Sequence, residues 1–516
     1  MPRHFKHTDK ERGHALCHVQ GSFKLEGLPV ARPGEVLGLI GRNGIGKSTT
    51  LKLLAGILQP NFGHLDKPTH LQEILSLFPN KELRHYLNQI LLGKLKVVMK
   101  PQHFKDMEGS TTAPNLRSLL GKYDSKMEEI CHELELKELL DKPFRKLTHG
   151  QLQRVMIAAV ASEEADVYIF DEPSCFLDVR ERFIAARVIR NLLTRDNYVI
   201  VSDNDLSLLD YLSETIYCLH GKPGACGLLS RSYNARDGLH MFLTGFDSIT
   251  SLRIRDDSLI FQFPHSPPRV TGSRFGFRKL SYGPMTRTVL GQNGTGKSTF
   301  IRMLISLGLP DQASVGRSME RTVRRLPNLE FHWSEGNLFA SQVMKPLQID
   351  QLMDRKVSSL SPGELQRVTI AVCLGRHAVV YLIDEPSAHL DADERVNVAI
   401  AIKRRMLSMT ATAIVVEHDF MMATYLADQV ILAERRVGSN FCFINSPCSL
   451  SEGMNKFLSQ QLDIITCRQD PNDFILTPRI NKLRSLSESE QKLSGQYYEE
   501  RERPRFYFPA EIRLRF

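Results

Sequence analysis

The sequence predicts an α/β protein made of two tandem copies of one domain, each with a mainly parallel sheet and helices on both faces. Apolar runs of strand length alternate with segments of helical periodicity, which is the pattern of such a sheet. Three motifs of the first half also recur in the same order in the second half: residues 41–49 as 291–299, 147–154 as 360–367, and 171–178 as 384–391. This recurrence indicates a duplicated domain.

The expected strands are short apolar runs at residues 36–40, 167–170, 199–201, 380–383 and 413–416. Residues 48–57 follow the first run and have the apolar spacing of a helix. The runs at 167–170 and 380–383 end in Asp-Glu and are wholly apolar, as expected for strands buried on both faces of a sheet.

The predicted domain limits are a basic extension at 1–14, a first domain at 15–249, a hinge rich in proline and glycine at 250–283, and a second domain at 284–477. The second copy is shorter than the first. Lys47 and Gly150 are 103 residues apart, whereas Lys297 and Gly363 are 66 apart, a difference of 37. From Arg479 the chain turns polar, and an Arg-rich tail is expected at 499–516.

Composition excludes several classes of protein. The 516 residues are 42% hydrophobic and 24% charged, which is ordinary for globular domains, and the net charge of +9 with neutral His suits an acidic partner. No apolar run approaches the roughly 20 residues of a membrane span, and no secretory signal follows the basic N-terminus, so a cytoplasmic location is expected. The nine cysteines form no C-x-x-C pair, which argues against a zinc ribbon or a disulfide scaffold.

The glycine-rich motif indicates a phosphate-binding loop in each copy. Its glycines let consecutive backbone N–H groups surround a phosphate at the N-terminus of a helix, and the lysine reaches the β- and γ-phosphate oxygens. Ser48 and Ser298 are expected to bind Mg²⁺. One such loop could be an accidental turn, but two in register cannot. The predicted ATP ligands of the loops are Gly41, Asn43, Gly44, Gly46, Lys47, Ser48 and Thr49, and Gly291, Asn293, Gly294, Gly296, Lys297, Ser298 and Thr299.

The Asp-Glu pairs complete the predicted chemistry. Asp171 and Asp384 end apolar strands, where a carboxylate can hold Mg²⁺ opposite the phosphate loop. Glu172 and Glu385 are placed to polarise the attacking water for in-line phosphoryl transfer. A solvated charge at a strand end is the alternative for each glutamate, and the shared Asp-Glu-Pro-Ser-x-x-Leu-Asp context argues against it.

The segment at 360–367, Leu-Ser-Pro-Gly-Glu-Leu-Gln-Arg, resembles the signature of ABC-type ATPases, and both copies resemble their P-loop domains with helical subdomains. The resemblance narrows to the ABC subfamily E ribosome-recycling ATPases, also called the RNase L inhibitor family. It covers roughly residues 15–498 and rests on 23–41, 343–349, 417–428, 453–459 and 478–483. The stretch at 478–498 is similar to the second hinge of that family.

The resemblance implies that each ATP is held between the phosphate loop of one domain and the signature of the other. The first composite site would combine loop 41–49 with Gln102, Asp171, Glu172, Ser361, Gly363 and Glu364. The second would combine loop 291–299 with Asp384, Glu385, His418, Thr148, Gly150 and Gln151. Gln102 is expected to contact the metal. Phe23 lies where the family stacks an aromatic ring on adenine, and a core position is the alternative.

The resemblance also implies a function. ATP-driven closure of the domains would separate ribosomal subunits, with a release factor or its paralogue bound, and the protein would stay on the rRNA of the small subunit. Initiation factors are further expected partners, and the chain would be a monomer with intramolecular domain pairing. The positive charge fits contact with rRNA phosphates. A general translation-factor or DNA-repair ABC ATPase is a rival, but the long linker helices expected of one are absent from the sequence.

Several residues depart from the family pattern. One cysteine precedes the first phosphate loop, so the ferredoxin-like domain and its iron–sulfur clusters are not expected. Asn204 stands at the position of the switch histidine and lacks the basicity of imidazole. His149 and Pro362 replace signature glycines, and the metal-contacting loop of the second copy falls in the deletion. Slowed hydrolysis is expected, and a degenerate paralogue acting as a scaffold or inhibitor is the alternative function.

Overall fold

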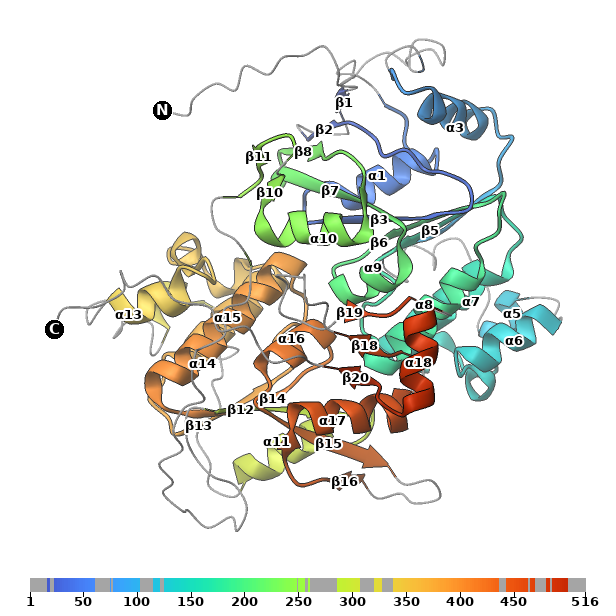
Figure 1. Cartoon of the computed structure of the whole chain (residues 1–516). Helices are drawn as coiled ribbons and strands as arrows, with labels where there is room; N and C mark the ends of the chain where they lie inside the picture. Colours follow the sequence, from blue (N-terminus) through green and yellow to red (C-terminus); the bar gives the residue numbers. More distant parts are fainter. Residues whose placement is uncertain are drawn as a thin grey trace. The chain divides into compact units, whose positions relative to one another are not determined.

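The computed structural model describes residues 16–18, 23–60, 75, 78–102, 115–120, 125–247, 249–255, 259, 285–306, 320–326, 337–435, 442–462, 465–468, 479–482 and 485–499. The chain divides into two compact units (Figure 1). Unit 1 comprises residues 1–177 and 181–258, and unit 2 comprises 178–180 and 259–516. The predicted extension at 1–14, most of the predicted hinge at 250–283 and the tail beyond Glu499 lie outside the described residues. The domain limits drawn from the sequence therefore stay a prediction.

Unit 1 is built on a sheet with the strand order β1-β2-β8-β7-β3-β6-β5-β4, and β9 pairs with β7. Strands β4, β5, β6, β3 and β7 are parallel to one another. The predicted strands at 36–40, 167–170 and 199–201 are confirmed as β3, β5 and β6. The strands are β1 Leu16–His18, β2 Lys24–Glu26, β3 Val36–Gly41, β4 Val97–Lys100, β5 Val167–Asp171, β6 Tyr198–Ser202, β7 Thr215–Lys222, β8 Cys226–Leu229 and β9 Tyr233–Asn234.

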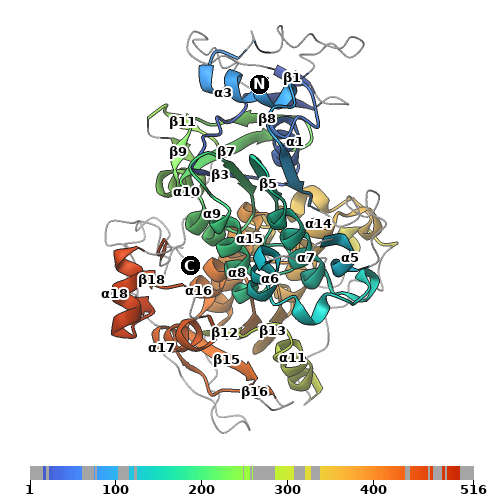
Figure 2. The ribbon, with the colours of Figure 1, turned by 90° about the vertical axis from the view of Figure 1, so that its right-hand side faces the viewer.

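Helix α1 lies on one face of this sheet, with α9 and α10 on the other (Figure 1, Figure 2). The predicted helix at 48–57 begins at Lys47 and ends at Leu54, and Ile57 beyond it is exposed. Leu51, Leu53 and Leu54 of α1 pack in the core beneath the sheet. The helices are α1 Lys47–Leu54, α3 Lys81–Leu91, α5 Leu116–Leu120, α6 Ser125–Glu133, α7 His149–Ser162, α8 Val179–Asn191, α9 Leu206–Leu212 and α10 Ala235–Thr244, with 3-10 turns at Lys137–Leu139 and Phe144–Lys146.

Unit 2 repeats the centre of this sheet with the strand order β13-β14-β12-β15-β16, and β17 pairs with β15. Strands β13, β14, β12 and β15 are parallel, which confirms the predicted strands at 380–383 and 413–416. One difference matters for the site: β5 is covered by β4, whereas no strand in the described residues pairs with the outer edge of β13. The strands are β12 Met285–Leu290, β13 Val380–Asp384, β14 Thr412–Val416, β15 Gln429–Arg435, β16 Cys442–Ile444 and β17 Cys448–Ser449.

Helix α11 lies on one face of the second sheet, with α15 and α16 on the other (Figure 1). The helices are α11 Lys297–Ser306, α13 Asn337–Phe339, α14 Pro362–Leu374, α15 Ala392–Met409, α16 Phe420–Leu426, α17 Leu450–Lys456 and α18 Leu486–Ser494. Short 3-10 turns span Val323–Arg325, Ile349–Leu352 and Val357–Ser359, and π-helical turns span Ala340–Met344 and Phe457–Leu462. No helix in the described part of the chain has the length and apolar character to span a membrane.

Two small sheets lie outside the main ones. In unit 1, β10 (Phe246–Asp247) pairs with β11 (Leu252–Arg253), so the first residues of the predicted hinge fold back onto this unit. In unit 2, β18 (Cys467–Arg468) pairs with β19 (Arg479–Ile480) and with β20 (Tyr498–Glu499). Described residues of the predicted second hinge therefore supply β19 and Tyr498 of β20 to this sheet, with α18 between these two strands in the sequence, whereas β18 precedes the hinge.

Candidate nucleotide sites

The two glycine-rich loops connect a central parallel strand to a helix in the same way. Lys47 at the start of α1 donates from Nζ to the carbonyl oxygens of Gly41 at 2.7 Å and Arg42 at 3.3 Å. Lys297 donates to the carbonyl oxygens of Gly291 at 2.9 Å and Gln292 at 2.7 Å. Both lysines are 6% exposed. Each ammonium group thus lies under its own loop, where a phosphate held by the loop N–H groups would meet it.

The other predicted loop ligands lie around these lysines. Gly46 caps α1 with φ of 106°, a conformation that side chains disfavour, and a Cβ there would lie 2.8 Å from Cζ of Phe23. Asn43, Gly44, Asn293, Gly294 and Thr299 are exposed, and Ser48, Thr49, Gly296 and Ser298 are partly buried. The loops are therefore open to solvent on their outer side.

Phe23 is partly buried and packs against the apolar core of unit 1 as well as against Gly46. This contact agrees with the core alternative for Phe23. It also leaves the ring beside the phosphate loop, where adenine stacking stays a prediction.

Asp171 ends β5 beside the first loop and is 2% exposed. Burial raises the pKa of its carboxyl group, and a hydrogen bond with the Ser48 hydroxyl opposes that rise. Its Oδ1 atom is buried and has no hydrogen-bond partner among the described residues. A buried carboxylate oxygen beside a serine hydroxyl is a donor set that suits Mg²⁺, which prefers oxygen ligands. Asp171 and Ser48 thus fit the predicted metal site of unit 1.

Glu172 is held by two neutral amides. Its Oε2 accepts a hydrogen bond from Nε2 of Gln102 at 2.8 Å, and its Oε1 accepts one from Nδ2 of Asn204 at 3.0 Å. Asn204 also accepts from Nζ of Lys47 at 3.1 Å and donates to Asn43 at 3.4 Å. The structure therefore brings together the predicted phosphate ligand, metal ligand, base and switch residue of the first site. Asn204 bridges the lysine and the glutamate.

Lys100 is a site neighbour that the sequence analysis missed. It ends β4, is fully buried, and donates from Nζ to the carbonyl oxygens of Asp171 at 2.8 Å and Pro101 at 3.0 Å. Burial lowers the pKa of its ammonium group to about 8. These bonds tie the ends of β4 and β5 together and so set Gln102 against Glu172. A lysine at the end of an otherwise apolar strand was the available signal.

The carboxylates of unit 2 are more exposed than those of unit 1. Asp384 and Glu385 are both exposed, in contrast to buried Asp171 and partly buried Glu172. Among the described residues no strand pairs with the outer edge of β13, whereas β4 and Gln102 cover the corresponding edge in unit 1. Nε2 of His418 lies 3.4 Å from Oε1 of Glu385. The predicted switch histidine and base of unit 2 therefore face each other.

Both glutamates share an uncommon backbone conformation. Glu172 and Glu385 each have φ of 46°, in the left-handed region. Each backbone N–H is bound to the end of the neighbouring strand, by Ser202 O at 2.7 Å and Val416 O at 2.9 Å. Strained residues held in this way are concentrated at functional sites.

The two signature segments cap helices in their own units. Thr148 with Gln151, and Ser361 with Glu364, form reciprocal capping boxes at the starts of α7 and α14. A Cβ on Gly150 would lie 2.8 Å from the carbonyl oxygen of Phe176, and one on Gly363 would lie 2.9 Å from that of His389. Each signature glycine is therefore required by close packing within its own unit.

The replaced signature residues differ between the units. The His149 ring packs against the Phe176 ring, with centroids 5.1 Å apart. Pro362 takes the first helical position of α14, where its missing N–H removes no intrahelical bond. Pro362 is therefore compatible with the local fold, as is His149.

Each unit has a parallel sheet with a phosphate loop after its central strand, Asp-Glu at the end of the next strand but one, and a capped signature helix. These features define an ABC-type ATPase, here with two nucleotide-binding units. In agreement, a sequence model of the family described as ABC transporter matches residues 30–175 and 279–388.

Relatives that match over most of this chain identify the family within this class. The chain is 45% identical to "ABC transporter E family member 1" of Arabidopsis thaliana over 92% of this chain and 84% of that protein. It is 39% identical to "Translation initiation factor RLI1" of Saccharomyces cerevisiae, with the same coverage. The archaeal ribosome recycling factor aABCE1, solved with the ribosomal stalk protein aP1, matches with a TM-score of 0.84 and 35% identity over 95% of this chain and 100% of that chain. The chain belongs to the ABC E family.

Proposed function

We propose that this ATPase acts on the ribosome, in subunit dissociation after termination and in translation initiation. The names of its relatives support this proposal: one is a translation initiation factor, and one is an archaeal ribosome recycling factor. A structure of ribosome-bound archaeal Pelota and ABCE1 matches with a TM-score of 0.78 and 35% identity over 94% of this chain and 86% of that chain. The proposed partners are the small subunit with its rRNA, a release factor or its paralogue, and initiation factors, all in the cytoplasm.

In the proposed mechanism each ATP is bound by the loop of one unit and the signature of the other. Lys47 and Lys297 hold the β- and γ-phosphates, and Ser361, Gly363 and Glu364 or Thr148, Gly150 and Gln151 close over the nucleotide. Bound Mg²⁺ would supply charge neutralisation of the phosphates, with Ser48, Gln102 and Asp171 as its ligands in unit 1 and Ser298 and Asp384 in unit 2. Glu172 and Glu385 orient and deprotonate water, while Asn204 and His418 hold the γ-phosphate.

The single observation that carries the catalytic part is the grouping of Lys47, Gln102, Glu172 and Asn204 by direct hydrogen bonds. ATP turnover with and without ribosomes tests it. We expect Glu172→Gln and Glu385→Gln each to lower turnover while the affinity for ATP persists, and ribosomal subunits to separate only with ATP. Wild-type turnover in either variant would remove that glutamate from the mechanism.

A scaffold or inhibitor with little turnover is the second candidate. Both carboxylate oxygens of Glu172 accept amide hydrogen bonds, so an attacking water would have to compete with these amides for the carboxylate. Under this alternative the chain binds ATP and a ribosomal or RNase L-like partner without ribosome-stimulated hydrolysis. Steady-state turnover that rises on addition of ribosomes would exclude it.

We expect no iron–sulfur cluster on this chain, because its nine cysteines are scattered through the sequence. Iron analysis and the visible absorbance of protein purified without oxygen would test this expectation. Iron in stoichiometric amount would contradict it.

A further inference from the structure

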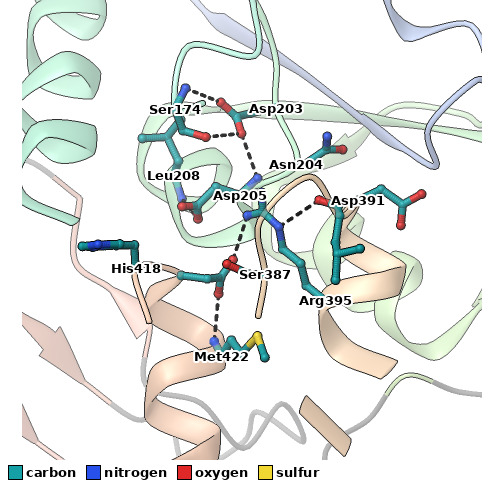
Figure 3. A network of polar contacts seen from close by, with 12 residues as sticks. Ser174, Asp203, Asn204, Asp205, Leu208, Ser387, Asp391, Arg395, His418 and Met422 are labelled. Atoms are coloured by element: carbon teal, nitrogen blue, oxygen red, sulfur yellow. Dashed lines mark hydrogen bonds and ion pairs between the residues drawn. The ribbon is translucent and has the colours of Figure 1, made fainter. Parts of the chain in front are cut away.

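In unit 1 a closed set of hydrogen bonds joins the segment after Glu172 to the loop that carries Asn204 (Figure 3). Ser174 donates to Asp203 from its backbone N at 2.9 Å and from Oγ at 2.6 Å. Asp203 also accepts from the backbone N of Asp205 at 2.8 Å. Arg182 closes the set, with Nη1 bound to Asp205 at 2.7 Å and Nε bound to the carbonyl oxygen of Leu177 at 2.8 Å. We call Ser174, Leu177, Arg182, Asp203 and Asp205 clamp 1.

Unit 2 contains the same set. Ser387 donates to Glu417 from its backbone N at 3.2 Å and from Oγ at 2.6 Å, and Glu417 also accepts from the backbone N of Asp419 at 2.9 Å. Arg395 binds Asp419 through Nη1 at 2.9 Å and the carbonyl oxygen of Leu390 through Nε at 3.0 Å. We call Ser387, Leu390, Arg395, Glu417 and Asp419 clamp 2. Glu417 takes the place of Asp203 and accepts one further bond, from the backbone N of His418 at 2.7 Å, and the other bonds are the same.

The four carboxylates in the two clamps are at most 5% exposed. Buried ionised groups are costly unless they are paired and hydrogen-bonded. In each clamp an arginine and several N–H and O–H donors bind the carboxylates and offset this cost. The same five-residue arrangement persists in both units although the switch residues and the metal loops have diverged. Local stability alone does not require an acidic residue on each side of the switch residue, because apolar side chains of the same volume are often as stable.

The clamped segments also hold a strained residue. Phe176, between Ser174 and Leu177 of clamp 1, has φ of 64°, and His389, between Ser387 and Leu390 of clamp 2, has φ of 63°. Both side chains are exposed, so burial does not compensate this conformation. A left-handed conformation of this kind costs on the order of 1–3 kcal/mol and persists where the surroundings fix both ends of the segment. In each unit the clamp binds the serine at one end and the leucine carbonyl at the other.

We propose that the clamps are positioning devices of the two ATPase sites: each fastens the switch residue, Asn204 or His418, to the segment behind the catalytic glutamate, so that the two move as one body. The proposal rests on the proposed function of the site. The clamp residues are positioning residues, because they act through Asn204, His418 and the glutamates and do not contact the nucleotide.

The test uses the full chain with Glu172→Gln as parent, which leaves Glu385 as the remaining base. Ser387→Ala removes one bond of clamp 2 and keeps the backbone bond, and Arg395→Met removes two bonds. Arg395→Lys keeps the charge if the methionine variant does not fold. The matched controls are Ser341→Ala, an exposed serine of unit 2, and Arg404→Met, an exposed arginine on the same helix as Arg395. The measurements are kcat and the affinity for a fluorescent ATP analogue without Mg²⁺.

We expect each clamp variant to lower kcat by about tenfold with affinity within about twofold, and the controls to match the parent. The double variant with Ser387→Ala and Arg395→Met is expected to lose no more kcat than the more impaired single variant. The reason is that either substitution alone already separates the switch residue from the segment behind the glutamate. The proposal would be overturned by any of three results: losses of kcat that multiply in the double variant, a kcat of the single variants equal to that of the parent, or an ATP affinity that falls in parallel with kcat.

If the Glu172→Gln parent does not turn over ATP, Ser174→Ala and Arg182→Met are compared in the Glu385→Gln parent. Inactivity of both parents would refute the proposed function, and the clamp proposal with it.

Discussion

The side-chain amide of Asn204 donates a hydrogen bond to Oε1 of Glu172 across 3.0 Å. In unit 2 the corresponding pair is an imidazole and a carboxylate, with His418 Nε2 at 3.4 Å from Glu385 Oε1. The two glutamates have the same backbone conformation. The difference between the units is the side chain that faces each carboxylate. An amide donates a neutral hydrogen bond and cannot take up a proton near neutral pH, whereas imidazole can.

A reciprocal exchange of these two residues should redistribute turnover between the units. With Glu385→Gln as parent, Asn204→His is expected to raise kcat about tenfold, because imidazole restores a basic partner beside Glu172. With Glu172→Gln as parent, His418→Asn is expected to lower kcat by a similar factor. Single-turnover hydrolysis of labelled ATP measures both. The same direction of change in both parents would contradict the role assigned to the switch residue.

Gln102→Ala should raise the Mg²⁺ concentration that half-saturates turnover by Glu172, by about three- to tenfold. The amide of Gln102 binds Glu172 at 2.8 Å, and Gln102 is a predicted metal contact. The Glu385→Gln parent isolates this unit, and Gln89→Ala on α3 is the matched control. Titration of turnover with Mg²⁺ at saturating ATP gives the result. An unchanged Mg²⁺ requirement would remove Gln102 from the metal site.

His149→Gly should raise turnover by Glu385 in the Glu172→Gln parent, because it removes a side chain from a signature position that is expected to close over ATP. It should also lower the free energy of unfolding by about 1 kcal/mol, since the ring contact with Phe176 is lost. Phe176→Leu separates the two effects: it removes the ring contact and leaves His149 in place. If both variants change turnover equally, the ring contact and not the bulk of His149 sets the rate.

Glu417→Gln should flatten the pH dependence of stability. Burial and then the charge of Asp419 raise the pKa of Glu417 to about 7 from its ordinary value of 4.5. The folded state therefore holds a proton that the unfolded state releases. The stabilisation is complete below about pH 4.5 and is lost as pH rises through about 7, a change on the order of 3 kcal/mol.

Urea unfolding between pH 4.5 and 8 checks this expectation. The wild-type free energy of unfolding should fall more steeply with pH than that of Glu417→Gln. Glu452→Gln, which alters an exposed pair with Lys456, should follow the wild-type slope. Parallel slopes for wild type and Glu417→Gln would show that the pKa of Glu417 is not raised in the folded protein.

The repeated motifs predicted the class of fold and the strands that carry the site. A buried parallel strand needs a continuous apolar run, and a phosphate loop needs glycines at fixed spacing, so both leave a local trace in the sequence. The strands at 167–170 and 380–383 and the helix after residue 47 were found in this way. The helix ends three residues earlier than predicted, where exposed Ile57 continued the apolar spacing without packing against the core.

The clamp arginines could not be assigned from sequence. Arg182 and Arg395 stand in helices rich in charged residues, where a solvated arginine gives the same pattern. Their roles depend on which backbone carbonyl and which carboxylate they meet after residues far apart in sequence come together. The exposure of Asp384 and Glu385 is likewise a property of the sheet, since no strand of the described residues pairs with the outer edge of β13.

The sequence by itself determined that the chain has two phosphate-binding units of one family, since spacing and residue type within a few positions suffice for such loops. Only the tertiary structure decided what surrounds each glutamate: two amides bind the carboxylate in unit 1, a histidine faces it in unit 2, and a buried clamp lies behind both. Hydrogen bonds and burial depend on contacts between segments brought together by folding, and no local pattern encodes them.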